Sequence, residues 1–447
     1  MPPAHLPTVE AQTLSTLNLR PVAATLGILL AILGGAMLLP ALVDFARGSG
    51  GHQAFIGAAA VTVFVGVLLW MAGRDSEVQK LDLRQAFLLT SSVWVVLTVF
   101  AALPLMWGSS KLPFTKAVFE TMSGLTTTGA SVMSGLDAQA PGILLWRALL
   151  HWFGGIGIIG IAIAVLPVLS IGGMQLFRTE SSDKSEKFLP RAGAIAKGLV
   201  TAYVLLTLIC AICYAAAGLG LFDSVTLAMS TLSSGGFANS DYSLTVFKNP
   251  AVDYVAIVFM LVAALPFPLY LRAMTGDARR LISNAEVQLF LTLVAFFAGL
   301  SFIQQTVQGI ASGEAAFRGA LFTVASLMST TGFMGVDYTH WGAASDAIFF
   351  VAMFLGGCTG STAGGLKAMR IAITGKAIRQ HLKRVSFKNG IFPLRYGGAP
   401  VPDDVVASVL GFVFLYVFTF LVVGIALCLM GLDLTTAYSA SIACLAN

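Results

Sequence analysis

The chain reads STTGFMG at residues 329–335, where hydroxyl side chains run into a glycine and an aromatic ring. Two earlier stretches resemble it, TTTGAS at 126–131 and SSGGFA at 233–238. All three lie in a chain of 447 residues that is 57% hydrophobic and only 11% charged. Because a soluble domain carries roughly 25% charged residues, we predict an all-α polytopic membrane protein embedded in a lipid bilayer.

Nine apolar runs are long enough to cross a bilayer, whose core of about 30 Å needs roughly 20 helical residues. They cover 22–46, 53–73, 84–107, 143–169, 196–217, 251–271, 285–304, 344–372 and 405–430. Four further apolar pieces are too short to cross, near 114–125, 221–232, 315–328 and 433–446. The predicted unit is therefore a helix, a half-helix, a polar loop and a returning helix.

The basic residues predict the orientation. With the N-terminus in the cytoplasm, most of the 26 Lys and Arg residues fall on the inner side, as the positive-inside rule requires. The half-helices then all lie on the outer side, which has a net negative charge. We therefore expect a multi-pass protein of the bacterial cytoplasmic (inner) membrane.

The unit recurs along the chain as a pseudo-fourfold repeat preceded by two additional helices. The predicted divisions are a two-helix extension at 1–80, pore repeats at 81–175, 190–275 and 283–375, a cytoplasmic linker at 376–402 and the start of a fourth repeat at 403–447. We expect this fourth repeat to be incomplete, because its loop glycine would follow Asn447.

Each polar loop centres on a glycine with two hydroxyl or small residues before it and a serine six residues before it. Irregular backbone at membrane depth occurs where it is buried or lines water, and rings of backbone carbonyls can replace the hydration shell of a cation. The C-terminal end of a half-helix also favours a cation. The predicted filter residues are Thr127, Thr128, Gly129, Ser234, Gly235, Gly236, Thr330, Thr331 and Gly332. The alternative is that these small residues serve only close helix packing.

A second glycine-rich stretch, GGCTGSTAGG, occupies 356–365 within an apolar run that is long for one span. Glycine clusters break transmembrane helices at functional points. The pattern predicts a non-helical insert below the filter that moves aside as a gate, and a kinked, closely packed helix is the alternative. The predicted gate residues are Gly356, Gly357, Gly360, Ser361, Thr362, Gly364 and Gly365. For HWFGGIGIIG at 151–160, a packing face is the preferred interpretation.

Two other classes of function are weighed. An ion-coupled secondary transporter, a symporter of Na⁺ or H⁺ with K⁺, needs an ionisable residue near mid-membrane; Glu120 and Arg147 are the nearest candidates, and both lie toward the outer side. A membrane enzyme needs an acid–base or metal constellation, which the sequence does not offer, so we predict that the chain is not an enzyme. No nucleic-acid partner is expected.

The stretches TMSGLTTTGAS, HWFGGIGIIG, STLSSGGFANSDYS, MSTTGFMG and GGCTGSTAGGLK resemble one family over about 22–447. This is the superfamily of potassium transporters that includes bacterial Trk and Ktr membrane subunits and plant HKT proteins. The two additional N-terminal helices favour the Trk-type branch.

The resemblance implies that K⁺ is the transported ion, with Gly129, Gly236 and Gly332 as filter glycines and 356–365 as an intramembrane loop. A glycine rather than a serine at 129 implies selectivity for K⁺ over Na⁺. It also implies a homodimer with one pore in each protomer, and a cytoplasmic ring of nucleotide-binding regulatory subunits. Coupling to sodium or protons and the regulating nucleotide stay open. Because the family carries a fourth loop, we expect the sequence to be truncated before it.

Overall fold

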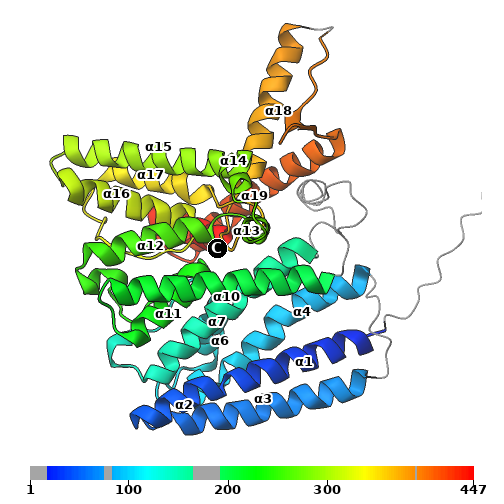
Figure 1. Cartoon of the computed structure of the whole chain (residues 1–447), viewed down its shortest axis with the longest axis vertical. Coiled ribbons are helices and arrows are strands. Elements are labelled where there is room, and N and C mark those ends of the chain that lie inside the picture. The colour runs from blue at the N-terminus through cyan, green and yellow to red at the C-terminus, as the bar shows by residue number, and fades with distance from the viewer. Residues whose placement is uncertain (1–17, 75–82, 165–191, 388–389) are drawn as a thin grey trace, which may run out of the picture.

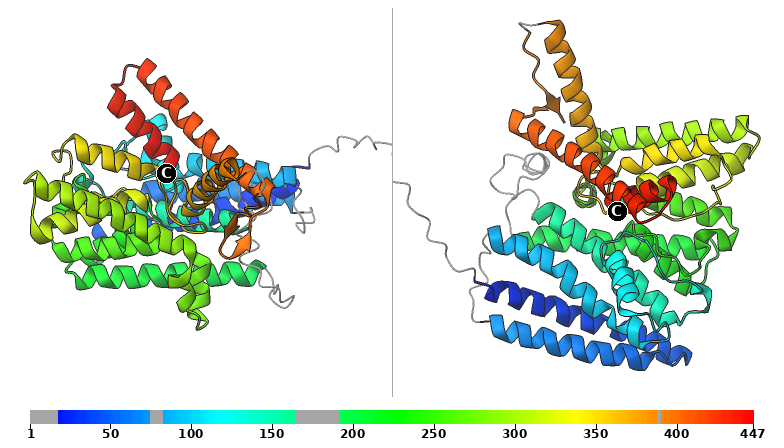
Figure 2. Two further views of the ribbon diagram at one scale, coloured as in Figure 1. Left: turned by 90° about the horizontal axis from the view of Figure 1, so that it is seen from above. Right: turned by 180° about the vertical axis from the view of Figure 1, so that it is seen from behind.

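The structure is a computed structural model that describes residues 18–74, 83–164, 192–387 and 390–447. Its helices lie side by side in a stack, with the N-terminal helices at one end and the third repeat at the other (Figure 1). The C-terminus lies near the middle of the stack, which is clearest from behind (Figure 2). One helix, α18 (Ala368–Ser386), projects away from the stack (Figure 1).

The N-terminal extension consists of α1 (Arg20–Ala36), α2 (Leu38–Arg47) and α3 (His52–Gly73). The buried side chain of Asp44 on α2 accepts a hydrogen bond of 2.7 Å from the backbone N–H of Gly142, at the start of α7 (Pro141–Ala164). A carboxylate is favourable at a helix N-terminus. This contact therefore fastens the extension to the first repeat.

Three groups of helices follow along the chain. The first holds α4 (Leu83–Ala101), α5 (Leu103–Trp107), α6 (Phe114–Leu125), η1 (Leu136–Ala138) and α7. The second holds α10 (Ala192–Ala216), α11 (Leu221–Leu232), η3 (Ser243–Phe247), α12 (Pro250–Ala263) and α13 (Phe267–Met274). The third holds α14 (Arg279–Ser283), α15 (Ala285–Val307), α16 (Gly313–Met328) and α17 (Ala343–Phe354). The chain continues through α18 (Ala368–Ser386), a small ribbon of β1 (Arg395–Tyr396) and β2 (Ala399–Pro400), α19 (Asp403–Leu429) and α20 (Leu434–Ala446).

The four short apolar pieces are confirmed as half-helices: α6, α11, α16 and α20 begin and end within two residues of the predicted limits. The all-helical membrane class is also confirmed, since seven described helices are long and apolar enough to span a bilayer. Large apolar side chains such as Phe414 and Ile425 on α19 are exposed, as expected of a surface that faces lipid. The end of the predicted span 143–169 lies outside the described residues.

The prediction of a continuous span at 251–271 is wrong. The structure breaks this segment between α12 and α13, which meet at an angle of 95°. Pro266 stands at the break, and proline cannot donate the backbone hydrogen bond that would continue a helix. The run 344–372 is interrupted by a non-helical insert, as the glycine-rich stretch predicts, because the chain is non-helical between α17 and α18.

Candidate functional site

The three polar loops, which we call the first (126–131), second (233–238) and third (329–335) pore loops, leave their half-helices through the same hydrogen bond. The residue before the loop glycine donates its N–H to the carbonyl of the serine six residues before that glycine. The pairs are Thr128 with Ser123 at 2.9 Å, Gly235 with Ser230 at 2.9 Å and Thr331 with Ser326 at 3.0 Å. This is the six-to-one bond that ends many helices. The serine noted in the sequence is thus the residue whose carbonyl accepts the hydrogen bond that ends the half-helix.

The backbone of each pore loop is left-handed twice, two residues apart. The residue two before the glycine has a φ of 61° at Thr127, 56° at Ser234 and 57° at Thr330. The glycines have a φ of 77° at Gly129, 78° at Gly236 and 76° at Gly332. A β-branched residue at positive φ is strained, and such strain gathers at functional sites. The three loops thus share one irregular backbone conformation, left-handed at the same two positions.

The loop glycines make the loops fit against each other. A Cβ atom on Gly129 would overlap the carbonyl oxygen of Gly235, and one on Gly236 would overlap the carbonyl oxygen of Thr331. The first loop therefore lies against the second, and the second against the third. At the end of α20, the Asn447 amide donates to the Thr126 carbonyl at 2.6 Å. The ends of the four half-helices thus gather around one point.

The glycine-rich loop (356–365) touches the pore loops directly. The hydroxyl of Thr362 lies 2.8 Å from that of Ser234, in the second pore loop. The N–H of Gly364 donates to the Thr330 hydroxyl at 2.7 Å, in the third. The N–H of Gly365 donates to the Ala446 carbonyl at 2.6 Å, on α20. The structure thus places 356–365 against two pore loops and the fourth half-helix.

The same loop is held on its other side by the break between α12 and α13. The N–H of Cys358 donates to the Ala264 carbonyl at 2.8 Å, and the N–H of Phe267 donates to the Gly360 carbonyl at 2.9 Å. Within the loop, a Cβ on Gly356 would overlap the Gly364 carbonyl, so the two strands of the loop lie in contact. The bend at Pro266 therefore frees backbone groups that bind the glycine-rich loop.

A single carboxylate fastens the loop at two points. Glu286, buried at the start of α15, accepts hydrogen bonds from the N–H of Thr359 at 2.7 Å and from the N–H of Met369 at 3.1 Å. The hydroxyl of Thr359 also donates to it at 2.9 Å. Sequence reasoning missed Glu286, because one carboxylate at the end of a span gives no signal of a partner some 73 residues away.

Two further predictions concern the stretch 151–160 and the pair of Glu120 and Arg147. HWFGGIGIIG is confirmed as a packing face, since a Cβ on Gly154 would overlap the Leu125 carbonyl at the end of α6. Glu120 and Arg147, considered as coupling residues, form a buried ion pair of 2.9 Å with each other. Their opposite charges neutralise each other, and Arg147 contacts the first and second pore loops through Ser131 and Ala238.

The fold and these loops define a class: a polytopic membrane protein in which half-helices bring irregular, glycine-centred loops to one point. Residues 51–447 match the TrkH family of cation transport proteins, and the chain belongs to that family. It is 37% identical over 431 residues to the Trk system potassium uptake protein TrkI of Halomonas elongata, covering 96% of this chain and 87% of that one. It is 33% identical to the TrkH protein of Escherichia coli K12, covering 96% of this chain and 90% of that one.

A solved structure agrees with the fold. The crystal structure of the potassium transporter TrkH from Vibrio parahaemolyticus matches with a TM-score of 0.88 at 32% identity. The match covers 96% of this chain and 89% of that chain.

Proposed function

We propose that the protein carries K⁺ into the cell across the bacterial cytoplasmic membrane through a selectivity filter formed by the pore loops. The observation that carries the proposal is the shared geometry of the three loops, each with the same capping bond and the same pair of positive φ angles. The names of its relatives, potassium uptake proteins of Trk systems, support K⁺ as the ion.

The physical basis is dehydration by backbone carbonyls. A cation that enters the filter exchanges its hydration shell for carbonyl oxygens of the loops. The half-helices α6, α11 and α16 end at these loops, so that the partial negative charge of each C-terminus points at the ion. In the described structure Gly129 and Gly236 are only half-buried although their neighbours Thr127 and Ser234 are buried. The loops thus offer backbone, not side chain, to the conduction path.

The glycine-rich loop serves as the gate of this pore. It contacts the second and third pore loops through Thr362 and Gly364. It has no regular helical hydrogen bonding of its own between Leu355 and Lys367, so that its displacement breaks individual bonds, such as those to Ala264, Phe267 and Ala446, and does not unwind a helix. Local openings of this kind draw on the least stable parts of a fold.

The resemblance to Trk and Ktr subunits further supports a homodimer with a pore in each protomer, and a cytoplasmic ring of nucleotide-binding regulatory subunits. The N-terminus would lie in the cytoplasm. Light scattering of the purified protein in detergent tests the dimer, and a mass of one protomer contradicts it. Co-purification with a ring-forming nucleotide-binding subunit tests the second partner.

The test of the function is growth of cells that lack their own potassium importers. Cells that express the protein should grow at low external K⁺ and take up K⁺ in preference to Na⁺. The variant Gly236→Ala should abolish this growth, and Gly299→Ala is the matched control, because a Cβ at Gly299 on α15 meets no atom within 4 Å. Growth of the Gly236→Ala cells that equals wild type would contradict the filter.

A further inference from the structure

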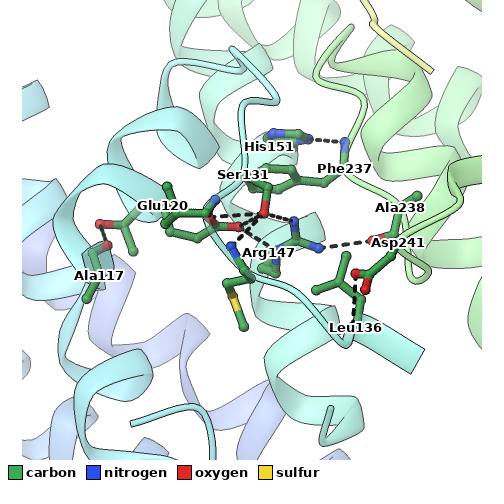
Figure 3. Close-up of polar contacts among 12 residues, drawn as sticks. Ala117, Glu120, Ser131, Leu136, Arg147, His151, Phe237, Ala238 and Asp241 are labelled. Atoms are coloured by element: carbon green, nitrogen blue, oxygen red, sulfur yellow. Dashed lines mark hydrogen bonds and ion pairs between the residues drawn. The ribbon is translucent and has the colours of Figure 1, made fainter. Parts of the chain in front are cut away.

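A charged pair lies buried behind the first pore loop. Nε of Arg147, on α7, donates to Oε1 of Glu120, on α6, at 2.9 Å, and the two side chains are 2% and 0% exposed (Figure 3). Removing two charges from water carries a penalty that their attraction repays only when further hydrogen bonds satisfy both groups. The remaining contacts of this pair therefore indicate what it holds.

The carboxylate of Glu120 binds the chain where it leaves the first pore loop. It accepts from the hydroxyl of Ser131 at 2.9 Å and from the N–H of Val132 at 2.9 Å. The half-helix that enters the loop is thus joined to the segment that leaves it. Glu120 therefore links the two ends of the first pore loop.

The guanidinium of Arg147 binds both loops. One terminal nitrogen donates to the Ser131 hydroxyl at 3.1 Å, in the first loop, and the other donates to the Ala238 carbonyl at 3.0 Å, in the second. The guanidinium carbon also lies 4.0 Å from the centre of the Phe237 ring. Phe237 follows the second loop glycine directly, so one side chain connects the two loops next to their glycines.

His151 completes the arrangement one helical turn along α7. Its ring stacks on Phe237 with centroids 4.0 Å apart and an angle of 15° between the planes. Its Nδ1 accepts a bond of 3.4 Å from the Phe237 N–H, and a Cβ on Gly235 would overlap the imidazole. Phe237 is therefore in contact with Arg147 and His151 at once, and Figure 3 shows both side chains reaching it from α7.

The second and third repeats carry no acidic residue at the position of Glu120. Counted nine residues before the loop glycine, the position of Glu120 is taken by Leu227 in the second repeat and Thr323 in the third. The second and third loop segments are joined by neutral bonds instead, from the N–H of Leu244 to the Met334 carbonyl and from the N–H of Met334 to the Ser243 hydroxyl, both at 3.1 Å.

We propose that Arg147 and His151 are positioning residues that fix the spacing between the first and second pore loops and thereby set the preference for K⁺ over Na⁺. The inference rests on the proposed filter. The two terminal nitrogens of Arg147 hold Ser131 of the first loop and Ala238 of the second at a fixed separation. Phe237 cannot shift without losing its contacts with Arg147 and His151. Neither residue contacts the ion. Discrimination by carbonyls depends on the number and placement of the oxygens, so a shift of one loop relative to the next alters it.

The test is Arg147→Lys, measured as the K⁺-over-Na⁺ preference of uptake in cells without their own potassium importers. Lysine keeps the charge but lacks the planar fork that binds two partners at once. Losing one charge-assisted hydrogen bond corresponds to about a tenfold change, and we expect the K⁺-over-Na⁺ ratio to fall by about that factor. The matched control is Arg318→Lys, because Arg318 joins Asp253 and Glu314 at a distance from the pore loops and should leave the ratio unchanged.

A second variant distinguishes a change in selectivity from a failure of the protein to fold. His151→Phe keeps a ring against Phe237 but removes the acceptor at Nδ1, and it should also lower the ratio while uptake of K⁺ continues. A merely structural role would reduce the amount of protein in the membrane and the total uptake without moving the ratio. An unchanged ratio in both variants, or the failure of both to accumulate, would overturn the inference. Failure of the proposed function would differ, because the wild-type protein itself would then show no preference for K⁺.

Discussion

The pore loops and the glycine-rich loop are both irregular backbone between helices, but they are held in different ways. Each pore loop is closed by a capping bond to its own half-helix, and the first two are joined by the buried pair of Glu120 and Arg147. The glycine-rich loop is held by bonds to other segments and by one carboxylate, Glu286. The pore loops are thus attached mainly to their own half-helices and the glycine-rich loop mainly to other segments, so we expect the two regions to respond differently to substitution.

The largest effect is expected where a side chain would enter the contact between two pore loops. Gly236→Ala adds a methyl group against the Thr331 carbonyl at a φ of 78°. Strain and overpacking together amount to a few kcal/mol, or roughly a hundredfold loss of K⁺ uptake. Rubidium tracer uptake measures it, with Gly299→Ala as the control. Uptake within twofold of wild type would show that the second and third loops are not in contact during transport.

A smaller effect, on selectivity, is expected at the first pore loop. Gly129→Ser places a side chain against the Gly235 carbonyl at a φ of 77°. The carbonyls then lose their fit to K⁺, and we expect the K⁺-over-Na⁺ ratio to fall by about tenfold, the equivalent of about 1.4 kcal/mol. Competition of Na⁺ against rubidium uptake reports this ratio. Unchanged relative uptake of the two ions would count against the filter assignment.

A substitution that weakens the attachment of the glycine-rich loop should raise K⁺ uptake, not lower it. Glu286→Gln removes the negative charge that accepts bonds from Thr359 and Met369. Because bonds to a charged acceptor are roughly twice as strong as neutral ones, the loop opens more often, and uptake should rise by about threefold with an unchanged K⁺-over-Na⁺ ratio. The control Glu314→Gln, at an exposed position, should change neither quantity. A changed ratio with unchanged uptake would place Glu286 in the filter and not in the gate.

The smallest effect is expected at the contact between the two regions. Thr362→Val keeps the shape of the side chain but removes the hydroxyl that bonds Ser234, Leu232 and Ala263. Losing neutral hydrogen bonds at one site corresponds to a change of about two- to fivefold in the opening equilibrium, and uptake should rise accordingly. Single-channel recording measures the open time. A shorter open time would mean that this hydroxyl stabilises the open state.

Much of the fold could be predicted from the sequence, because local signals carried it. Length and hydropathy placed the half-helices correctly, and the glycines at 129, 236 and 332 marked the pore loops, since positive φ is a local property of the backbone. Hydropathy does not report where the axis of a helix bends. It therefore treated 251–271 as one span although Pro266 marks a bend of 95°.

The side chains that hold the site could not be predicted, since each acts across a long stretch of sequence. Arg147 binds Ala238, 91 residues away, and Glu286 binds Met369, 83 residues away. Within their own helices both are single charged residues near the end of a span, a pattern that also fits simple anchoring at the membrane surface. Only the folded chain shows which loops they hold.

The most direct test of the account is rubidium uptake by liposomes that contain the purified protein, with K⁺ or Na⁺ as the competing external cation. The account predicts that uptake requires the protein, that K⁺ competes strongly and that Na⁺ competes weakly. Equal competition by K⁺ and Na⁺, or no uptake above that of protein-free liposomes, would contradict a potassium-selective filter built from the pore loops.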